Sequence, residues 1–240
     1  MIKGIRFVTR RAGVSPEEFA EVWPHSVSAV TRAPSDVRPF RIALCTILPE
    51  LTGPDPAHDG AAIGWFTDAD HLRRFRRWVD TPEGRAVPGG LGRIIDHDAS
   101  PVVVAGEAVP RGADWLDRRW REGGVKLKHM AVAVRAAGLT PAEFSERWRG
   151  HAGRVRRPGA EQETPIPEEA RGLAYVQSHP CPRKAGAWAY DAINEVYFDD
   201  LEGLRTRIAW FAENIPDGAD PGLFGRSSFL AVREAVIPVP

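Results

Sequence analysis

The chain has 240 residues, with 32 lysines and arginines against 32 aspartates and glutamates, so its formal net charge is zero. This balance argues against a general nucleic-acid or membrane-surface binder, because both classes carry a strong basic excess. Cys45 and Cys181 form neither a disulfide framework nor a metal-ligand spacing. Because the chain has no apolar run of membrane-spanning length and no signal-peptide pattern at its start, we expect a cytoplasmic protein.

The first segment, MIKGIRFVTRR, predicts a strand. Ser15, Pro16 and Glu18 then mark the start of a helix, because they provide a capping side chain, a proline at the first helical position and an acid three residues after the cap. Two further strands follow, and Asp68 lies where the third strand gives way to a second helix. A last strand ends near Glu107–Val109.

The same series of elements returns in the second half of the chain. Lys3–Pro16 (KGIRFVTRRAGVSP) aligns with Lys128–Pro141 (KHMAVAVRAAGLTP) at a shift of 125 residues. The residue shift that aligns the two copies changes along the chain, which places an insertion of about eight residues in the second copy and a deletion before its last strand. The insertion lies in Pro158–Arg171, and the deletion lies where the first copy carries Thr81–Ala86 (TPEGRA). Two later blocks align at shifts of 132 and 127 residues: Gly64–Leu72 with Val196–Leu204, and Glu107–Val109 with Glu234–Val236.

Each copy therefore reads strand, helix, strand, strand, helix, strand, which is the ferredoxin-like βαββαβ unit. Helices cover only one face of such a sheet, so two units that pair sheet to sheet bury the other face. The sequence predicts an α+β fold in which two tandem ferredoxin-like units form an intramolecular dimeric α/β-barrel. We place the units at residues 1–110 and 125–240, with a linker at 111–124.

Three segments resemble the EthD family of the dimeric α/β-barrel superfamily: Phe144–His151 (FSERWRGH), Tyr175–His179 (YVQSH) and Val196–Leu204 (VYFDDLEGL). The first copy keeps Phe19–His25 (FAEVWPH) and TPEGRA but has no equivalent of YVQSH. The resemblance covers nearly the whole chain and implies the fold. It implies no single reaction, because the superfamily includes cofactor-free polyketide cyclases, quinone-forming monooxygenases, decarboxylases, lactone isomerases and heme enzymes.

Strand alternation predicts which side chains share a face. We expect Ile5, Phe7, Met130 and Val132 to pack on the helices, so that the opposite face of each sheet lines a cavity between the sheets. In the first copy this face is mostly Gly, Val, Ile and Leu, with Arg6 and Trp65 as exceptions. Because burying unpaired polar groups is costly, the polar face of the second copy predicts a single working site there. That face carries His129, Tyr175, Gln177, His179, Glu195, Tyr197, Phe229 and Arg233.

A histidine paired with an acid or a phenol is the usual general acid/base apparatus near neutral pH. His129 lies on a first strand, where it resembles the first-strand histidine of cofactor-free cyclases in the superfamily. By that resemblance, His129 or His179 acts as the base, Tyr175 or Tyr197 holds a developing oxyanion, and Glu195 orients the histidine. A substrate carboxylate or phenolate binds Arg233 or Arg6. The remaining expected substrate contacts are Trp65, His151, Gln177 and Phe229.

Structural explanations stay open for several of these residues. His129 is equally well a hydrogen-bonded barrel residue, and His179 caps a strand end before Pro180. His151 ends a helix, where a histidine is a favourable C-terminal charge. Glu195 and Arg233 also fit an ion pair between strands.

The leading functional hypothesis is a cofactor-independent enzyme that acts on an aromatic or polyketide-type substrate by cyclisation, dehydration or decarboxylation. The alternatives are a cofactor-free quinone-forming monooxygenase, a non-catalytic small-molecule binding protein and a heme protein. We predict an aromatic small-molecule ligand, no metal site, no required cofactor, and neither a nucleic-acid nor a membrane partner. The exposed sheet edges leave homodimerisation open.

Overall fold

The computed structural model describes residues 1–28, 30–53, 56–85, 91–151, 153–183, 185–215 and 220–239. Two βαββαβ units follow one another along the chain. The first consists of β1 (Ile2–Arg10), α1 (Pro16–Val22), β2 (Arg41–Ile47), β3 (Gly60–Phe66), α3 (Ala69–Val79) and β5 (Val102–Arg111). The second consists of β6 (Gly124–Arg135), α7 (Pro141–Arg149), β9 (Ala174–Pro180), β10 (Ala192–Phe198), α9 (Leu201–Asn214) and β11 (Phe224–Ile237).

Short elements decorate both units. In the first they are η1 (Trp23–Ser28), η2 (Val30–Arg32), α2 (Pro49–Thr52), α4 (Pro82–Arg85), α5 (Leu91–Ile94) and β4 (Ile95–Asp96). In the second they are β7 (Arg154–Val155), β8 (Thr164–Pro165) and α8 (Glu168–Arg171). Of the TPEGRA segment, Ala86 lies outside the described residues. Within the described ranges, no helix has the length and apolarity needed to cross a membrane.

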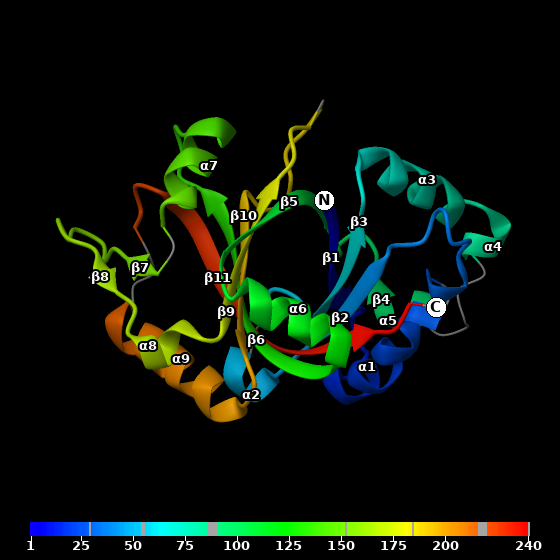
Figure 1. Cartoon of the computed structure of the whole chain (residues 1–240), viewed down its shortest axis with the longest axis horizontal. Coiled ribbons are helices and arrows are strands. Elements are labelled where there is room, and N and C mark those ends of the chain that lie inside the picture. The colour runs from blue at the N-terminus through cyan, green and yellow to red at the C-terminus, as the bar shows by residue number, and fades with distance from the viewer. Residues whose placement is uncertain are drawn as a thin grey trace.

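The main strands of the two units close into one antiparallel barrel (Figure 1). Within each unit the order is the ferredoxin-like one, β5-β1-β3-β2 and β11-β6-β10-β9. Between the units, β2 pairs with β11 and β9 pairs with β5, so eight of the described strands form a closed ring. The principal helices lie outside it, α1 and α3 around one unit and α7 and α9 around the other (Figure 1). The predicted fold class is confirmed.

The predicted helix starts form for the expected reason. The Ser15 side chain accepts from the Glu18 amide at 3.1 Å, and the Thr140 side chain accepts from the Glu143 amide at 3.2 Å. Glu143 also reaches back to the Thr140 amide at 2.8 Å, which completes a capping box in the second unit. The repeat seen in the sequence therefore extends to individual hydrogen bonds.

The interior of the barrel is filled by apolar side chains from both units. Ile5, Phe7, Met130 and Val132 belong to one buried cluster, each at most 1% exposed. These four residues do not pack on the helices, so their predicted face is wrong. Alternation establishes which residues share a face, but it does not establish which face turns inward.

A chain of buried ions crosses this interior. Lys3 pairs with Glu107 at 2.7 Å and also with Glu195, which in turn pairs with Lys128. Lys128 also pairs with Glu234, and Glu234 in turn pairs with Arg119. Three cations and three carboxylates therefore alternate, and their charges balance. In order they are Glu107, Lys3, Glu195, Lys128, Glu234 and Arg119.

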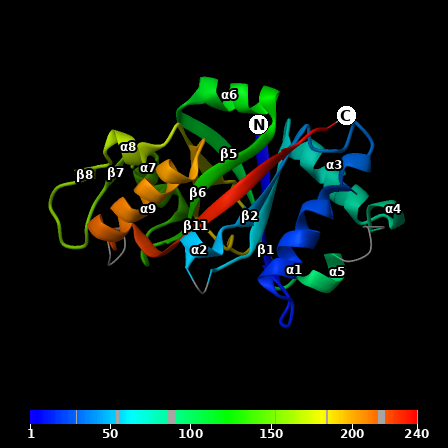
Figure 2. The ribbon, with the colours of Figure 1, turned by 90° about the horizontal axis from the view of Figure 1, so that it is seen from below.

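The arginine of this chain belongs to α6 (Ala113–Glu122), a helix that lies across one end of the barrel (Figures 1 and 2). Leu116 of α6 packs in a cluster with Val176 and Tyr197. The Trp120 ring meets the Trp65 ring edge-on at 4.7 Å. Helix α6, between β5 and β6, thus connects the two units and also covers the end of the shared core.

Candidate functional site

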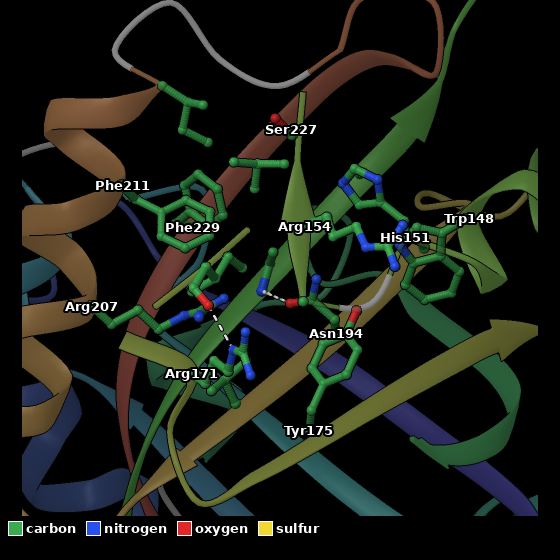
Figure 3. Close-up of a pocket in the computed structure, with 18 of the residues that line it drawn as sticks. Trp148, His151, Arg154, Arg171, Tyr175, Asn194, Arg207, Phe211, Ser227 and Phe229 are labelled. Atoms are coloured by element: carbon green, nitrogen blue, oxygen red, sulfur yellow. Dashed lines mark hydrogen bonds between the residues drawn. The ribbon is translucent and has the colours of Figure 1, made fainter. Parts of the chain in front are cut away.

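A cavity of about 510 Å³ lies on the second unit, outside the barrel. Its floor is the outer face of the sheet, and its sides come from α7, α9 and the β7–β8 hairpin (Figure 3). We expected the cavity between the two sheets, and that expectation is wrong because apolar side chains and the buried ions fill the space there. The hairpin lies in the part of the chain around the insertion that sets the second repeat apart from the first.

Small residues make room for this cavity. Ala131 and Ala133 of β6 and Ala192 of β10 form its floor. In the first unit, the positions equivalent to the two β6 alanines hold the larger Arg6 and Val8. The walls are mainly apolar and aromatic, so a planar hydrocarbon framework fits against them. The apolar wall residues are Trp148, Val155, Ile166, Val196, Phe211, Ile215, Phe224 and Phe229.

Arg207 of α9 reaches one end of the cavity. Its Nε donates to His129 Nδ1 at 3.0 Å, and its Nη1 donates to the Ala170 carbonyl at 2.8 Å. The residue is only 5% exposed, and both of these partners are neutral. Burial lowers the pKa of Arg207 to about 9, so the guanidinium stays charged at neutral pH.

Two more arginines lie at this end. Arg111 of β5 donates to the carbonyls of Arg171 and Gly172, and Arg171 Nε donates to the Ile166 carbonyl at 2.6 Å. A fourth lining arginine, Arg154, differs because it forms an ion pair with Glu163 at 3.4 Å. No aspartate or glutamate is among the described residues that line the cavity.

Tyr175 of β9 lies on the floor between the arginines and the opposite end (Figure 3). Gln177 Nε2 donates to its hydroxyl oxygen at 3.2 Å, so the hydroxyl proton is available for a ligand. Burial raises the pKa of Tyr175, which keeps the phenol protonated. Nearby, Asn194 Oδ1 accepts from the Ala131 amide at 3.2 Å, and the Asn194 side chain also hydrogen-bonds to Tyr175.

His151 occupies the other end, together with Trp148 (Figure 3). It follows the C-terminus of α7, and its ring lies 5.5 Å from the Phe224 ring in an edge-on arrangement. Burial lowers the pKa of His151, so the imidazole is neutral near pH 7. Neither ring nitrogen bonds to a described residue, and a neutral imidazole without a partner is suited to accept a proton.

His129 lies behind Arg207 and does not line the cavity. Its ring stacks on Phe229 at 4.8 Å, and burial lowers its pKa well below the ordinary value. Because arginine only donates, Nδ1 of His129 must be the acceptor, and the proton of the neutral ring resides on Nε2. His129 therefore positions Arg207 and faces the helix side of β6, opposite to the predicted face.

His179 packs under α7. Its Nδ1 lies 3.2 Å from Ser145 Oγ, and its ring lies 4.7 Å from the Trp148 ring. Tyr175, Gln177 and His179 share one face of β9, as predicted, but this face turns toward the helices. Only Tyr175 of the three lines the cavity, while Gln177 contacts it through that tyrosine and also donates to the Trp148 carbonyl at 3.1 Å.

The remaining predicted residues lie elsewhere. Glu195, Tyr197 and Trp65 face the barrel interior, where Tyr197 donates to Glu195 at 3.0 Å. Arg6 of the first unit contacts His97 at 2.7 Å. Arg233 is exposed on β11, whereas Glu195 pairs with Lys3 and Lys128. The ion pair between Glu195 and Arg233 that the sequence allowed therefore does not form. Of the predicted residues, Tyr175, His151 and Phe229 line the cavity.

Sequence reasoning missed Arg207, Arg111, Arg171 and Asn194. A signal existed for Arg207, because it lies between Leu204 and Phe211 at helical spacing, on the buried stripe of α9. Asn194 carried a similar signal as a polar residue in the helix-facing row of its strand. No local pattern marks Arg111 or Arg171, since their place in the site depends on how β5 meets β9 and α8.

The strand order and the outer helices define the class: the chain is a dimeric α/β-barrel protein with both halves on one chain. No family model matches its sequence, and no curated protein sequence matches it. Among solved structures, it is similar to a "putative monooxygenase" from Lactobacillus acidophilus NCFM, with a TM-score of 0.46, 11% identity and 99% of each chain covered. A chlorite dismutase variant from Candidatus Nitrospira defluvii has a TM-score of 0.41 and 11% identity, covering 99% of this chain and 92% of that one. At this identity the similarity concerns the fold alone.

Proposed function

We propose that the second-unit cavity binds a small anion with an aromatic or polyketide-type framework, and that the protein is a cofactor-independent enzyme that transforms it by acid–base chemistry. The observation that carries this proposal is Arg207, a buried cation whose described partners are all neutral. Burying a charge without a counter-charge is costly, so a ligand that supplies the negative charge completes the site.

The cavity orients such a ligand along its length. Its anionic group meets Arg207, and its planar body lies on Phe211 and Phe229. The far end of the ligand then reaches His151, with Tyr175 between the two ends (Figure 3). This arrangement separates the group that holds the substrate from the group that reacts.

In the proposed reaction, neutral His151 accepts a proton from an O–H or from a C–H next to a carbonyl. When the proton comes from the C–H, the electron pair of the broken bond moves to the carbonyl oxygen, which becomes an enolate; when it comes from a phenol O–H, the pair stays on that oxygen as a phenolate. Tyr175 donates a hydrogen bond to this oxygen as its charge develops. The imidazolium of His151 then returns the proton to the product or to a leaving group, which restores the neutral ring.

We infer that the chain belongs with the EthD proteins, on the motifs that suggested it. Those motifs supply part of the candidate site: Trp148 and His151 come from FSERWRGH, Tyr175 comes from YVQSH, and α9, which carries Arg207, begins within VYFDDLEGL. Their convergence on one cavity supports the assignment.

Ligand binding tests the first half of the proposal. Naphthalene-1-carboxylate should bind and raise the unfolding temperature, and naphthalene-1-methanol should bind far more weakly because it has no charge. Arg207→Met should weaken binding of the carboxylate by roughly tenfold to a hundredfold, as expected for a lost charged hydrogen bond. Arg233→Met removes one exposed positive charge and serves as the control. Equal binding of acid and alcohol, or no effect of Arg207→Met, would contradict the proposal.

Deuterium exchange tests the chemistry. 4-Acetylbenzoate joins a carboxylate to a methyl ketone, so NMR in heavy water reports proton abstraction directly. The wild type should accelerate exchange of the methyl protons, and His151→Gln should reduce that acceleration by roughly a hundredfold or more while 4-acetylbenzoate still binds. Unchanged exchange in His151→Gln would remove the base assignment.

Other results would favour the alternatives. Binding without exchange fits a carrier protein, and oxygen consumption with a hydroxylated aromatic fits a monooxygenase. A heme Soret band on addition of hemin would indicate heme binding, for which His151 is the histidine among the described lining residues.

A further inference from the structure

We infer that the anionic group of the ligand carries two negative charges, as a phosphate monoester or a pair of neighbouring carboxylates, bound jointly by Arg207, Arg171 and Arg111. This inference rests on the proposed function and narrows its substrate class. Arg154 does not belong to this group, because it already has Glu163 as its partner.

The three guanidinium groups lie together. Arg207 and Arg171 both line this end of the cavity (Figure 3), and Arg207 donates to the carbonyl of Ala170, the residue directly before Arg171. Arg111 donates to the backbone carbonyls of Arg171 and Gly172, which fixes its position beside α8. The three residues come from α9, α8 and β5, so the group forms only when the second unit packs against the last strand of the first.

Charge balance separates these arginines from three other arginines of the protein that have acidic partners. Arg119 pairs with Glu234, Arg10 with Asp59 and Arg135 with Asp191. Arg207, Arg171 and Arg111 instead donate to backbone carbonyls or to a neutral histidine, and none forms an ion pair with a described residue.

Repulsion among the three arginines also favours the binding of an anion. Burial lowers the pKa of Arg111, and the neighbouring Arg171 lowers it further. Arg111 in turn contributes to the lowered pKa of Arg207. A single negative charge leaves two of the three cations uncompensated, whereas a doubly charged group reduces the excess to one.

The unused donors suit such a group. Nε and Nη1 of Arg207 are engaged, which leaves Nη2 without a partner among the described residues. On Arg171, the described bond uses only Nε. Guanidinium groups bind phosphate and carboxylate oxygens through paired N–H donors, so several acceptor oxygens at one point satisfy more than one arginine. Phosphate monoesters and vicinal dicarboxylates both offer this arrangement.

Matched naphthalene ligands test the inference by titration at about pH 8, where a phosphate monoester is close to a full dianion. Naphthalene-1-sulfonate carries one charge, whereas 1-naphthyl phosphate and naphthalene-2,3-dicarboxylate carry two. We expect at least one dianion to bind roughly tenfold or more tightly than the sulfonate, because each further charged hydrogen bond contributes on that scale.

Two substitutions assign the preference to the arginines. Arg111→Gln should bring the ratio between dianion and sulfonate affinity close to one, and Arg171→Gln, at an exposed position, should reduce it in the same way without disturbing the core. Arg233→Gln changes the net charge equally at a distant exposed site, so the ratio should stay at the wild-type value.

The outcomes separate this inference from the proposed function. Preference for the phosphate alone, or for the dicarboxylate alone, supports the inference and identifies the source of the charge. If the sulfonate binds as tightly as both dianions and Arg207→Met abolishes that binding, the doubly charged group is refuted and the proposed function stands. If Arg207→Met affects none of the three ligands, both are refuted.

Discussion

Replacement of Glu195 by glutamine is expected to lower the free energy of unfolding by about 3–5 kcal/mol, the typical loss when one partner of a buried ion pair is removed. Glu195 lies between Lys3 and Lys128 and is fully buried. Burial alone would raise its pKa, but Lys128 and Lys3 hold the pKa below the ordinary range, so the carboxylate is charged. Glutamine keeps the shape and removes the charge, which leaves three cations facing two carboxylates. Urea unfolding followed by tryptophan fluorescence measures the change.

A double variant provides the matched control. Lys128→Met combined with Glu195→Gln removes one charge of each sign and leaves the pairs Lys3–Glu107 and Arg119–Glu234 intact. We expect it to recover more than half of the stability lost in the single variant, because removing one charge of each sign leaves no uncompensated charge in the core. A loss below about 1 kcal/mol in Glu195→Gln, together with loss of catalysis, would instead return Glu195 to the predicted active site.

The second large expected effect is a loss of unfolding free energy as the pH falls. His58 is buried, with Nε2 2.6 Å from the Tyr190 hydroxyl and Nδ1 3.0 Å from Thr9 Oγ1. Burial lowers the pKa of His58 to about 4. In the unfolded chain the histidine has a pKa of about 6.5, so the unfolded state binds the proton first as pH falls. The contribution of neutral His58 is therefore fully present above about pH 6.5 and is lost as pH falls toward 4, amounting to ~3 kcal/mol.

The interval from about pH 6.5 to pH 5 isolates the histidines, because carboxylates of the unfolded chain ionise at lower pH. The pKa of His129 is also lowered by burial, so it adds to the same slope. His58→Gln should reduce the slope of unfolding free energy against pH in this interval, while Tyr190→Phe should keep the slope because burial is the main cause of the shift. An unchanged slope in His58→Gln would contradict the assignment.

Local sequence information was sufficient for the elements and for the fold class. The Ser15 and Thr140 caps form as expected, since a capping box depends on residues three positions apart. The repeat identified two ferredoxin-like units, and the uncovered faces of their sheets required the units to pair. Residues that share a strand face were also recognised, as Tyr175, Gln177 and His179 show, because the side-chain period of a strand is two.

The position of the site required the tertiary structure. Alternation on β6 is satisfied with either His129 or Met130 facing inward, and the choice depends on what fills the barrel between the two units. There the polar side chains of Glu195 and Lys128 neutralise one another, so they are part of the core and leave no space for a ligand. The cavity instead forms where Ala131, Ala133 and Ala192 meet distant helices.

The three arginines of the cavity also could be recognised only from the tertiary structure. Each is an ordinary charged residue in the sequence, and many others lie on the surface. Only the packing of α9, α8 and β5 shows that Arg207, Arg171 and Arg111 converge without an acid among the described residues. Local chemistry determines which elements form, whereas the balance of charges in a buried space depends on residues far apart in the sequence, such as Arg111 and Arg207, 96 residues apart, and Lys3 and Glu195, 192 residues apart.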